Sequence, residues 1–175
     1  MASFVVVFFF SVTGLTLNHP DWFASQEQTT QYRGTLDPVW TSGSEVARLE
    51  IVERLRSNHQ IRGAVSDFRV DGGQCAVSFR GPGYTADAFI DRQTGAYELT
   101  EAKMGFAAVM NDLHKGRDSG SVWKGLIDVS AGLLTLVSLT GLVLLYFLYK
   151  QRIAGLLSLG AGAVIVFTTY LLFVP

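Results

Sequence analysis

The sequence is poor in cysteine and close to neutral in overall charge. Cys75 is the only cysteine, which excludes an intramolecular disulfide in any compartment. It alternates with Val77 and Phe79 as on one face of a strand, so a buried, unreactive thiol is favoured over a reactive one. The formal net charge is -1, which is too small for nucleic-acid binding through bulk charge. We therefore expect no nucleic-acid partner.

The sequence also lacks the motifs of common catalytic and metal sites. It contains no glycine-rich phosphate loop, no cysteine and histidine spacing typical of zinc, and no nucleophile elbow. We therefore expect no hydrolytic activity, and we assign neither catalytic residues nor metal ligands.

Charge is confined to the middle of the chain. All 15 acidic residues lie between Asp21 and Asp128, and 12 of the 14 basic residues lie between Arg33 and Lys124. Residues 129–149 and 153–174 carry no charge, and each segment can cross a hydrocarbon layer of about 30 Å as a helix. The sequence therefore predicts transmembrane helices at residues 123–149 and 153–174.

The first apolar segment, residues 1–17, is shorter and also fits the core of a secretory signal peptide. It has no basic start, however, and the sequence Asn-His-Pro-Asp-Trp at residues 18–22 offers no small residues for cleavage. We expect an uncleaved transmembrane helix, which gives three spans in total. A start that is truncated relative to the gene product is left open.

The short loop at residues 150–152 predicts the orientation. Lys150 and Arg152 favour a cytoplasmic position for this loop, whereas a long domain is translocated largely regardless of its charge. Residues 18–122 are then predicted to form a periplasmic domain.

This domain is predicted to have an α+β fold, with a helix packed on a small antiparallel sheet. Ser44 can cap a helix that runs to about Ser57. Its predicted apolar stripe consists of Val46, Leu49, Val52 and Leu55. Alternating apolar residues then predict strands near residues 64–70, 74–80, 84–90 and 96–100, with turns between them.

A second amphipathic helix is predicted over residues 103–115. Phe106, Met110 and Leu113 form its inward face, and the helix is expected to end at Gly116. This helix carries His114 towards the predicted membrane surface.

Together these segments resemble the PepSY-associated transmembrane proteins of bacteria. The resemblance covers essentially the whole chain, including the Asp-Arg-Gln-Thr-Gly turn at residues 91–95. Its most specific parts are residues 13–22, residues 113–117, which read Leu-His-Lys-Gly-Arg, and the Leu-Ile-Asp sequence at residues 126–128. Larger members usually carry a basic, histidine-containing stretch before the first helix, whereas this chain begins inside that helix.

The resemblance implies a multi-pass protein of the bacterial inner membrane. Some relatives resemble haem-containing reductases of ferric siderophores, while others lie near iron-uptake or flavin-transfer systems without a known role. The implied function is electron transfer or reduction of ferric iron or siderophores, with an accessory subunit as one form of it. Haem b is the implied cofactor, and other membrane-protein subunits are the implied partners besides the lipid bilayer.

Two histidines are the candidate ligands of such a haem. His19 follows the first helix and His114 precedes the second, so both are expected at the outer membrane face. Neutral imidazoles are usual axial ligands of b-type haem, and Lys115 and Arg117 are candidate partners for the propionates. The simpler interpretation is that His19 and His114 stabilise helix ends, and His59 is expected to be exposed to solvent.

A second function class remains open from the sequence. The domain is then a non-enzymatic module that regulates or assembles a neighbouring membrane complex. Small residues support close helix contacts in either case, because Ala154, Ser158 and Gly162 recur at four-residue spacing in the last apolar segment. A peptidase-modulating role, known for soluble relatives of the PepSY fold, is supported by no residue here.

Overall fold

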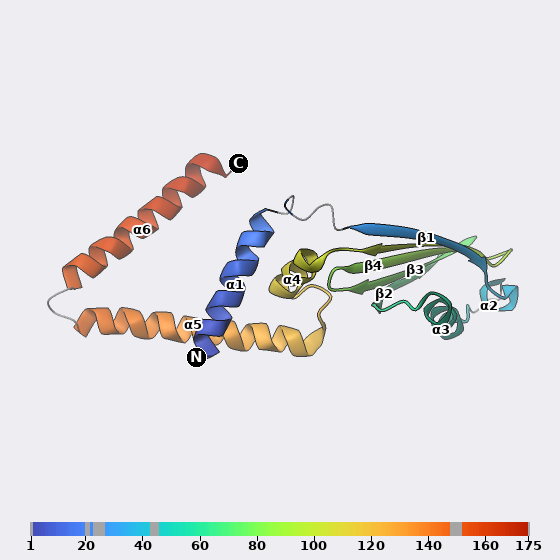
Figure 1. The fold of residues 1–175 in the computed structure, drawn as a ribbon, viewed down its shortest axis with the longest axis horizontal. Coiled ribbons are helices and arrows are strands. Elements are labelled where there is room, and N and C mark those ends of the chain that lie inside the picture. Colours follow the sequence, from blue (N-terminus) through green and yellow to red (C-terminus); the bar gives the residue numbers. More distant parts are fainter. Residues whose placement is uncertain (1, 20–21, 23–26, 43–45, 148–151, 175) are drawn as a thin grey trace. The chain divides into compact units, whose positions relative to one another are not determined.

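A computed structural model describes the whole chain except residues 1, 20–21, 23–26, 43–45, 148–151 and 175 (Figure 1). The chain divides into two compact units, residues 1–127 and residues 128–175. The predicted cap at Ser44 and most of the predicted loop at residues 150–152 lie outside the described residues.

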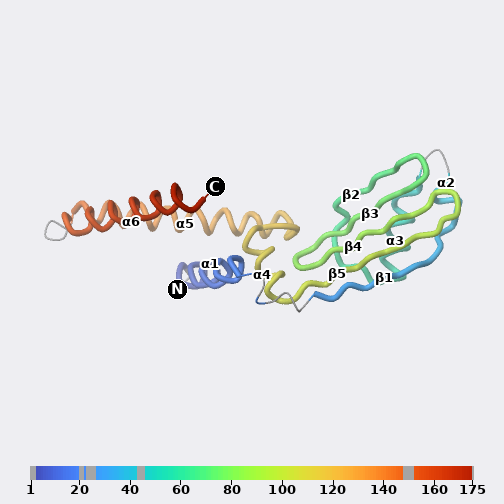
Figure 2. The backbone as a smooth tube through the Cα atoms, turned by 90° about the horizontal axis from the view of Figure 1, so that it is seen from above, coloured from blue at the N-terminus to red at the C-terminus, as the bar shows by residue number. Residues whose placement is uncertain are grey.

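The first unit is built on a five-stranded antiparallel sheet. Its strands are β1 (Gln28–Thr35), β2 (Ala64–Val70), β3 (Gln74–Gly81), β4 (Tyr84–Asp91) and β5 (Ala96–Lys103). They lie side by side in the order β1-β5-β4-β3-β2, as Figure 2 shows. Strands β2 to β5 form a meander, while β1 pairs with β5 at the opposite edge from β2. The four predicted strands are confirmed, and β1 was not predicted.

One face of the sheet carries the hydrophobic core. Helix α3 (Arg48–His59) covers this face together with the short helix α2 (Pro38–Ser42) (Figure 1). Ile51 and Leu55 of α3 are fully buried against Phe79 and Leu99 of the sheet. Cys75 is buried in the same core, as the alternating pattern predicted.

Three details of the predicted helices are wrong. The helix predicted from Ser44 begins at Arg48, so Val46 precedes it and is not part of its apolar stripe. Leu49 is 69% exposed, and Ile51 takes the buried place on α3 instead. Phe106 is 74% exposed on α4 (Phe106–Lys115), where it occupies the first position of the helix and extends beyond the sheet. The predicted end of α4 at Gly116 is confirmed, because Gly116 has a φ of 67°, a left-handed conformation that glycine adopts without strain.

The Asp-Arg-Gln-Thr-Gly sequence at residues 91–95 is a structural turn. Asp91 Oδ1 accepts hydrogen bonds from the backbone N–H groups of Gln93 and Thr94 at 2.9 and 2.8 Å. Arg92 Nε donates to the carbonyl of Thr41 at 3.0 Å, which joins the turn to α2. These contacts explain the motif without assigning it a chemical role.

The remaining helices are apolar. Two of them, α5 (Gly120–Phe147) and α6 (Arg152–Phe173), are long and apolar enough to cross a membrane. Helix α1 (Ala2–Asn18) has 17 residues, which gives a length of about 26 Å and leaves it short of a usual span. The structure thus supports two membrane-crossing helices, and the third predicted span is not shown.

Candidate functional site: the junction of α1 and α4

The sequence-predicted histidine at residue 114 lies where α4 contacts α1. His114 Nδ1 is 2.5 Å from Thr13 Oγ1 of α1. Thr13 is 4% exposed although it belongs to an otherwise apolar helix. Its buried hydroxyl has two hydrogen-bond partners, the carbonyl of Phe9 in its own helix and His114 of α4.

The hydrogen bonds of Thr13 determine which tautomer of His114 fits. The Thr13 hydroxyl donates its single hydrogen to the carbonyl of Phe9 at 2.7 Å. With that donation the hydroxyl accepts a hydrogen bond from His114, and on this basis we assign the imidazole proton to Nδ1. The lone pair on Nε2 is then left available to a proton or to a ligand.

The rest of the junction mixes one polar contact with aromatic ones. Thr16 Oγ1 donates to Asn111 Oδ1 at 2.7 Å, one turn away from His114. The ring of Phe10 packs edge-on against the imidazole of His114, with 4.9 Å between the ring centroids. Trp123 of α5 is hydrogen-bonded to α4 beside the junction: its Nε1 donates to the carbonyl of Leu113 at 2.8 Å.

Both burial and charge keep His114 neutral. Burial lowers the pKa of the imidazole, and the positive charge of neighbouring Lys115 lowers it further. The neutral form agrees with the hydrogen-bond pattern, in which Nδ1 donates to Thr13.

Helix α4 is also fixed to the sheet. Asp112 Oδ2 accepts a hydrogen bond from the backbone N–H of Gly83 at 2.8 Å, in the turn between β3 and β4. Asp112 and His114 thus tie a single helix to the sheet domain and to α1, respectively.

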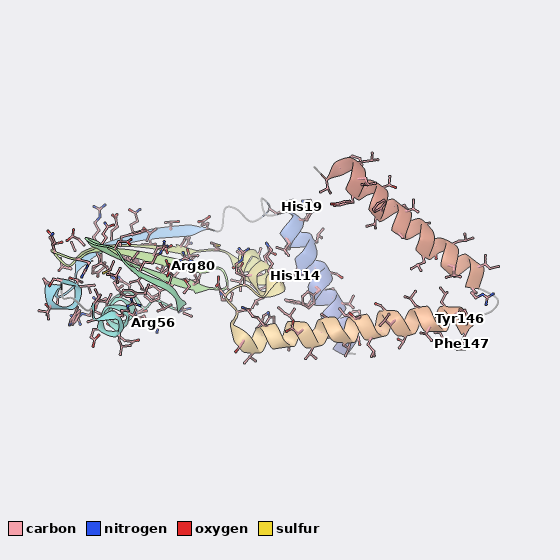
Figure 3. The ribbon with its side chains drawn as sticks, turned by 180° about the vertical axis from the view of Figure 1, so that it is seen from behind. His19, Arg56, Arg80, His114, Tyr146 and Phe147 are labelled. Carbon is pink, nitrogen blue, oxygen red and sulfur yellow. The ribbon has the colours of Figure 1, made fainter. Side chains whose placement is uncertain are left out.

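Of the other predicted haem-site residues, His19 has different ring partners, whereas Lys115 directly follows His114 and Arg117 lies three residues after it. The ring of His19 stacks on Trp22, with 4.2 Å between centroids and an interplanar angle of 3°. Figure 3 shows His19 at the end of α1 and His114 on α4. Lys115 and Arg117 are exposed.

Haem b, the group that the resemblance implies, can be tested against this geometry. Across the described parts of the chain, no contact joins the rings of His19 and His114, and each ring has other partners. The bis-histidine site therefore stays a prediction. His114 by itself has the tautomer and the neutral state that a ligand needs.

The third histidine differs from its prediction. His59 was expected to be exposed, but it is half-buried, and its Nε2 is 2.8 Å from the hydroxyl of Tyr97. Its ring also packs at 4.7 Å against Tyr32. The prediction failed because Tyr32 belongs to β1, the strand that the sequence did not reveal.

Comparison with known proteins decides the family. The sequence model of the PepSY_TM-like family matches residues 1–175. The chain belongs to the PepSY_TM-like family. The match and the two long apolar helices together indicate a PepSY-associated membrane protein. No match is found among curated proteins or among solved structures.

Sequence reasoning found His114 but missed its partner Thr13. A single threonine in an apolar helix is an ordinary feature, because its hydroxyl can bond to the backbone of its own helix.

Proposed function

We propose that this PepSY_TM-like protein is an accessory subunit of the bacterial inner membrane that binds a neighbouring membrane protein through its periplasmic sheet domain. Family membership and the two apolar helices support the membrane location. The observation that carries the binding role is the uncovered face of the sheet, opposite α3.

A single large apolar side chain marks the centre of this outer face. Phe89 lies on β4, the middle strand of the sheet, and is 53% exposed. Its cross-strand neighbours are Ala76 on β3 and Glu98 on β5. Aromatic residues at the centre of a surface are enriched among those that contribute most to protein binding.

Polar side chains around Phe89 are held in place by one another. Arg33 pairs with Glu98 at 3.0 Å, and Arg80 pairs with Asp87 at 2.8 Å. A fixed polar rim around an apolar centre is the usual organisation of a protein interface.

The edges of the sheet offer a second mode of contact. Strands β1 and β2 each pair on one side only, so their outer backbone groups can accept an added strand. β2 contains a register shift between Val65 and Asp67, which makes its edge irregular. β1 pairs regularly along its full length and is the better edge for strand addition.

The binding role is tested by co-purification of the tagged full-length chain from bacterial membranes in a mild detergent. A stable partner is expected to accompany the wild-type chain and to be lost with Phe89→Asp. Val39→Asp is the matched control, because Val39 is also exposed, at 77%, but lies on α2. Purification of the wild-type chain alone, or loss of the partner in both variants, would contradict the proposal.

We propose haem binding as the second candidate function, in support of electron transfer or reduction of ferric iron or siderophores. The specific observation is the neutral His114 with its proton on Nδ1, which leaves Nε2 as a possible axial ligand. Haem, when bound, would supply the one-electron chemistry. His114 would hold it from one side, and exposed Lys115 and Arg117 are available to the propionates.

An absorption spectrum of the purified full-length chain tests this candidate. A reducible b-type spectrum is expected that disappears in His114→Ala and survives in His59→Ala. A colourless preparation from haem-sufficient cells would refute it. If His19→Ala also abolishes the spectrum, His19 and His114 rearrange to bind haem together.

A further inference from the structure

A polar pocket lies on the α3 side of the sheet, away from Phe89 and from the α1–α4 junction. Its volume is about 530 Å³, within the size range of small-molecule sites. The lining residues come from β1, β5, the end of α3 and the segment that follows it: Tyr32, Asn58, His59, Gln60, Arg62 and Lys103.

The His59 wall of the pocket packs against two tyrosines. The imidazole of His59 is held between the ring of Tyr32 and the hydroxyl of Tyr97. Tyr97 is 6% exposed and lies directly over Gly34, where an added Cβ would come within 2.5 Å of the tyrosine hydroxyl. The absence of a side chain at Gly34 therefore makes room for Tyr97, which in turn positions His59.

The charge of Lys103 is partly balanced inside the domain. Its Nζ is 3.1 Å from Oε2 of Glu101, whose side chain is 4% exposed. The hydroxyl of Tyr84 donates to the other carboxylate oxygen at 2.9 Å. Burial raises the pKa of Glu101, but these hydrogen bonds outweigh it and lower the pKa overall, so Glu101 is ionised.

The charge of Arg62 is not balanced in this way. Within the described ranges, its guanidinium has no ion pair, and no acidic residue lines the pocket. Counting Arg62 and Lys103 against Glu101, which pairs with Lys103, leaves one unbalanced positive charge at the pocket.

We propose that this pocket binds a carboxylate-bearing ligand, with Arg62 as its main charged contact and Lys103 as the second. Arginine binds a carboxylate through two parallel N–H donors, and the amides of Asn58 and Gln60 add further donors. One unbalanced positive charge fits a single carboxylate better than a doubly charged phosphate. The proposal does not depend on the partner-binding role of the outer face.

The carboxylate can belong to a free organic acid or to the C-terminus of a peptide. β1 supplies Tyr32 to the pocket and is also the edge strand with an open side. A peptide that adds to β1 can reach the pocket with its terminal carboxylate. Both sources share the same recognition by Arg62.

The test is a calorimetric titration of the full-length chain in a nonionic detergent. The probes are propionate, a tetra-alanine peptide with a free C-terminus, the same peptide with an amidated C-terminus, and inorganic phosphate. Saturable binding is expected for propionate or the free peptide, and their relative affinities identify the source. Arg62→Gln should weaken this binding at least about tenfold, because a charge-assisted, two-donor contact is lost.

Arg54→Gln is the matched control, because it removes the same charge from an exposed position on α3 that does not line the pocket. It should leave carboxylate binding within about twofold of wild type. The proposal is overturned by an absence of saturable binding to either carboxylate probe or by equal binding of the amidated peptide. It is also overturned by tighter binding of phosphate, or by equal weakening in Arg54→Gln and Arg62→Gln.

Discussion

Replacing Thr13 by valine tests the α1–α4 junction directly. Valine keeps the shape of the side chain at a position that is 4% exposed, but it removes the acceptor for His114 Nδ1. The carbonyl of Phe9 loses the Thr13 hydroxyl as a second donor, but it stays within the regular backbone hydrogen bonding of α1. The main consequence is therefore an imidazole N–H without a partner.

The expected cost follows from the burial of that N–H group. An unsatisfied buried donor costs about 1–3 kcal/mol, and His114 is half-buried, so we expect about 1–2 kcal/mol. This free energy corresponds to roughly a 5- to 30-fold increase in local opening. Hydrogen–deuterium exchange of α4 amides in detergent micelles, resolved by mass spectrometry, measures that increase.

Two further variants make this test specific. Thr13→Ser keeps the hydroxyl and should exchange close to the wild-type rate. In a His114→Phe background, Thr13→Val should have little effect, since the donor is already absent. The reasoning is refuted if Thr13→Val and Thr13→Ser exchange equally, or if Thr13→Val has the same effect with and without His114.

Three other predictions concern pH, backbone conformation and the two faces of the sheet. His114 has a lowered pKa in the folded chain, so its contribution to stability is complete above its ordinary pKa of 6.5 and decreases as the pH falls through that value. A ¹⁵N NMR titration of the imidazole ring should show a pKa below 6.5 and the Nδ1–H tautomer. Gly95→Ala should destabilise the domain by at least about 2 kcal/mol in chemical denaturation, because Gly95 has a φ of 71° and an added Cβ would clash with the carbonyl of Leu36. Phe79→Ala should cost about 3–5 kcal/mol and Phe89→Ala less than about 0.5 kcal/mol, because only Phe79 is fully buried; equal costs would contradict the assignment of the two faces.

The sheet was predictable where its strands alternate between core and outer face. β3, β4 and β5 show this alternation clearly, and the turns between them contain glycine, proline or aspartate. β1 shows almost none, because Tyr32 is the only large apolar residue among Gln28–Thr35. An edge strand with one apolar residue is defined by its pairing with β5, which a local pattern does not contain.

The candidate site was predictable only in part, for a similar reason. The position of His114 at the end of α4 follows from helical periodicity and the stop at Gly116. Its contact with Thr13 joins residues 101 positions apart and depends on how α1 packs against α4. The pocket around Arg62 likewise requires β1, so neither its lining nor the burial of His59 was accessible from the sequence.

Site-specific photo-crosslinking in native membranes tests the proposed binding role most directly. A photoreactive phenylalanine analogue is placed at residue 89 on the outer face, or at residue 39 on α2 as a control that is even more exposed. The account predicts one discrete crosslinked membrane protein at residue 89, absent at residue 39 and competed by an excess of unlabelled wild-type chain. No crosslink at residue 89, or the same products at both positions, would contradict it.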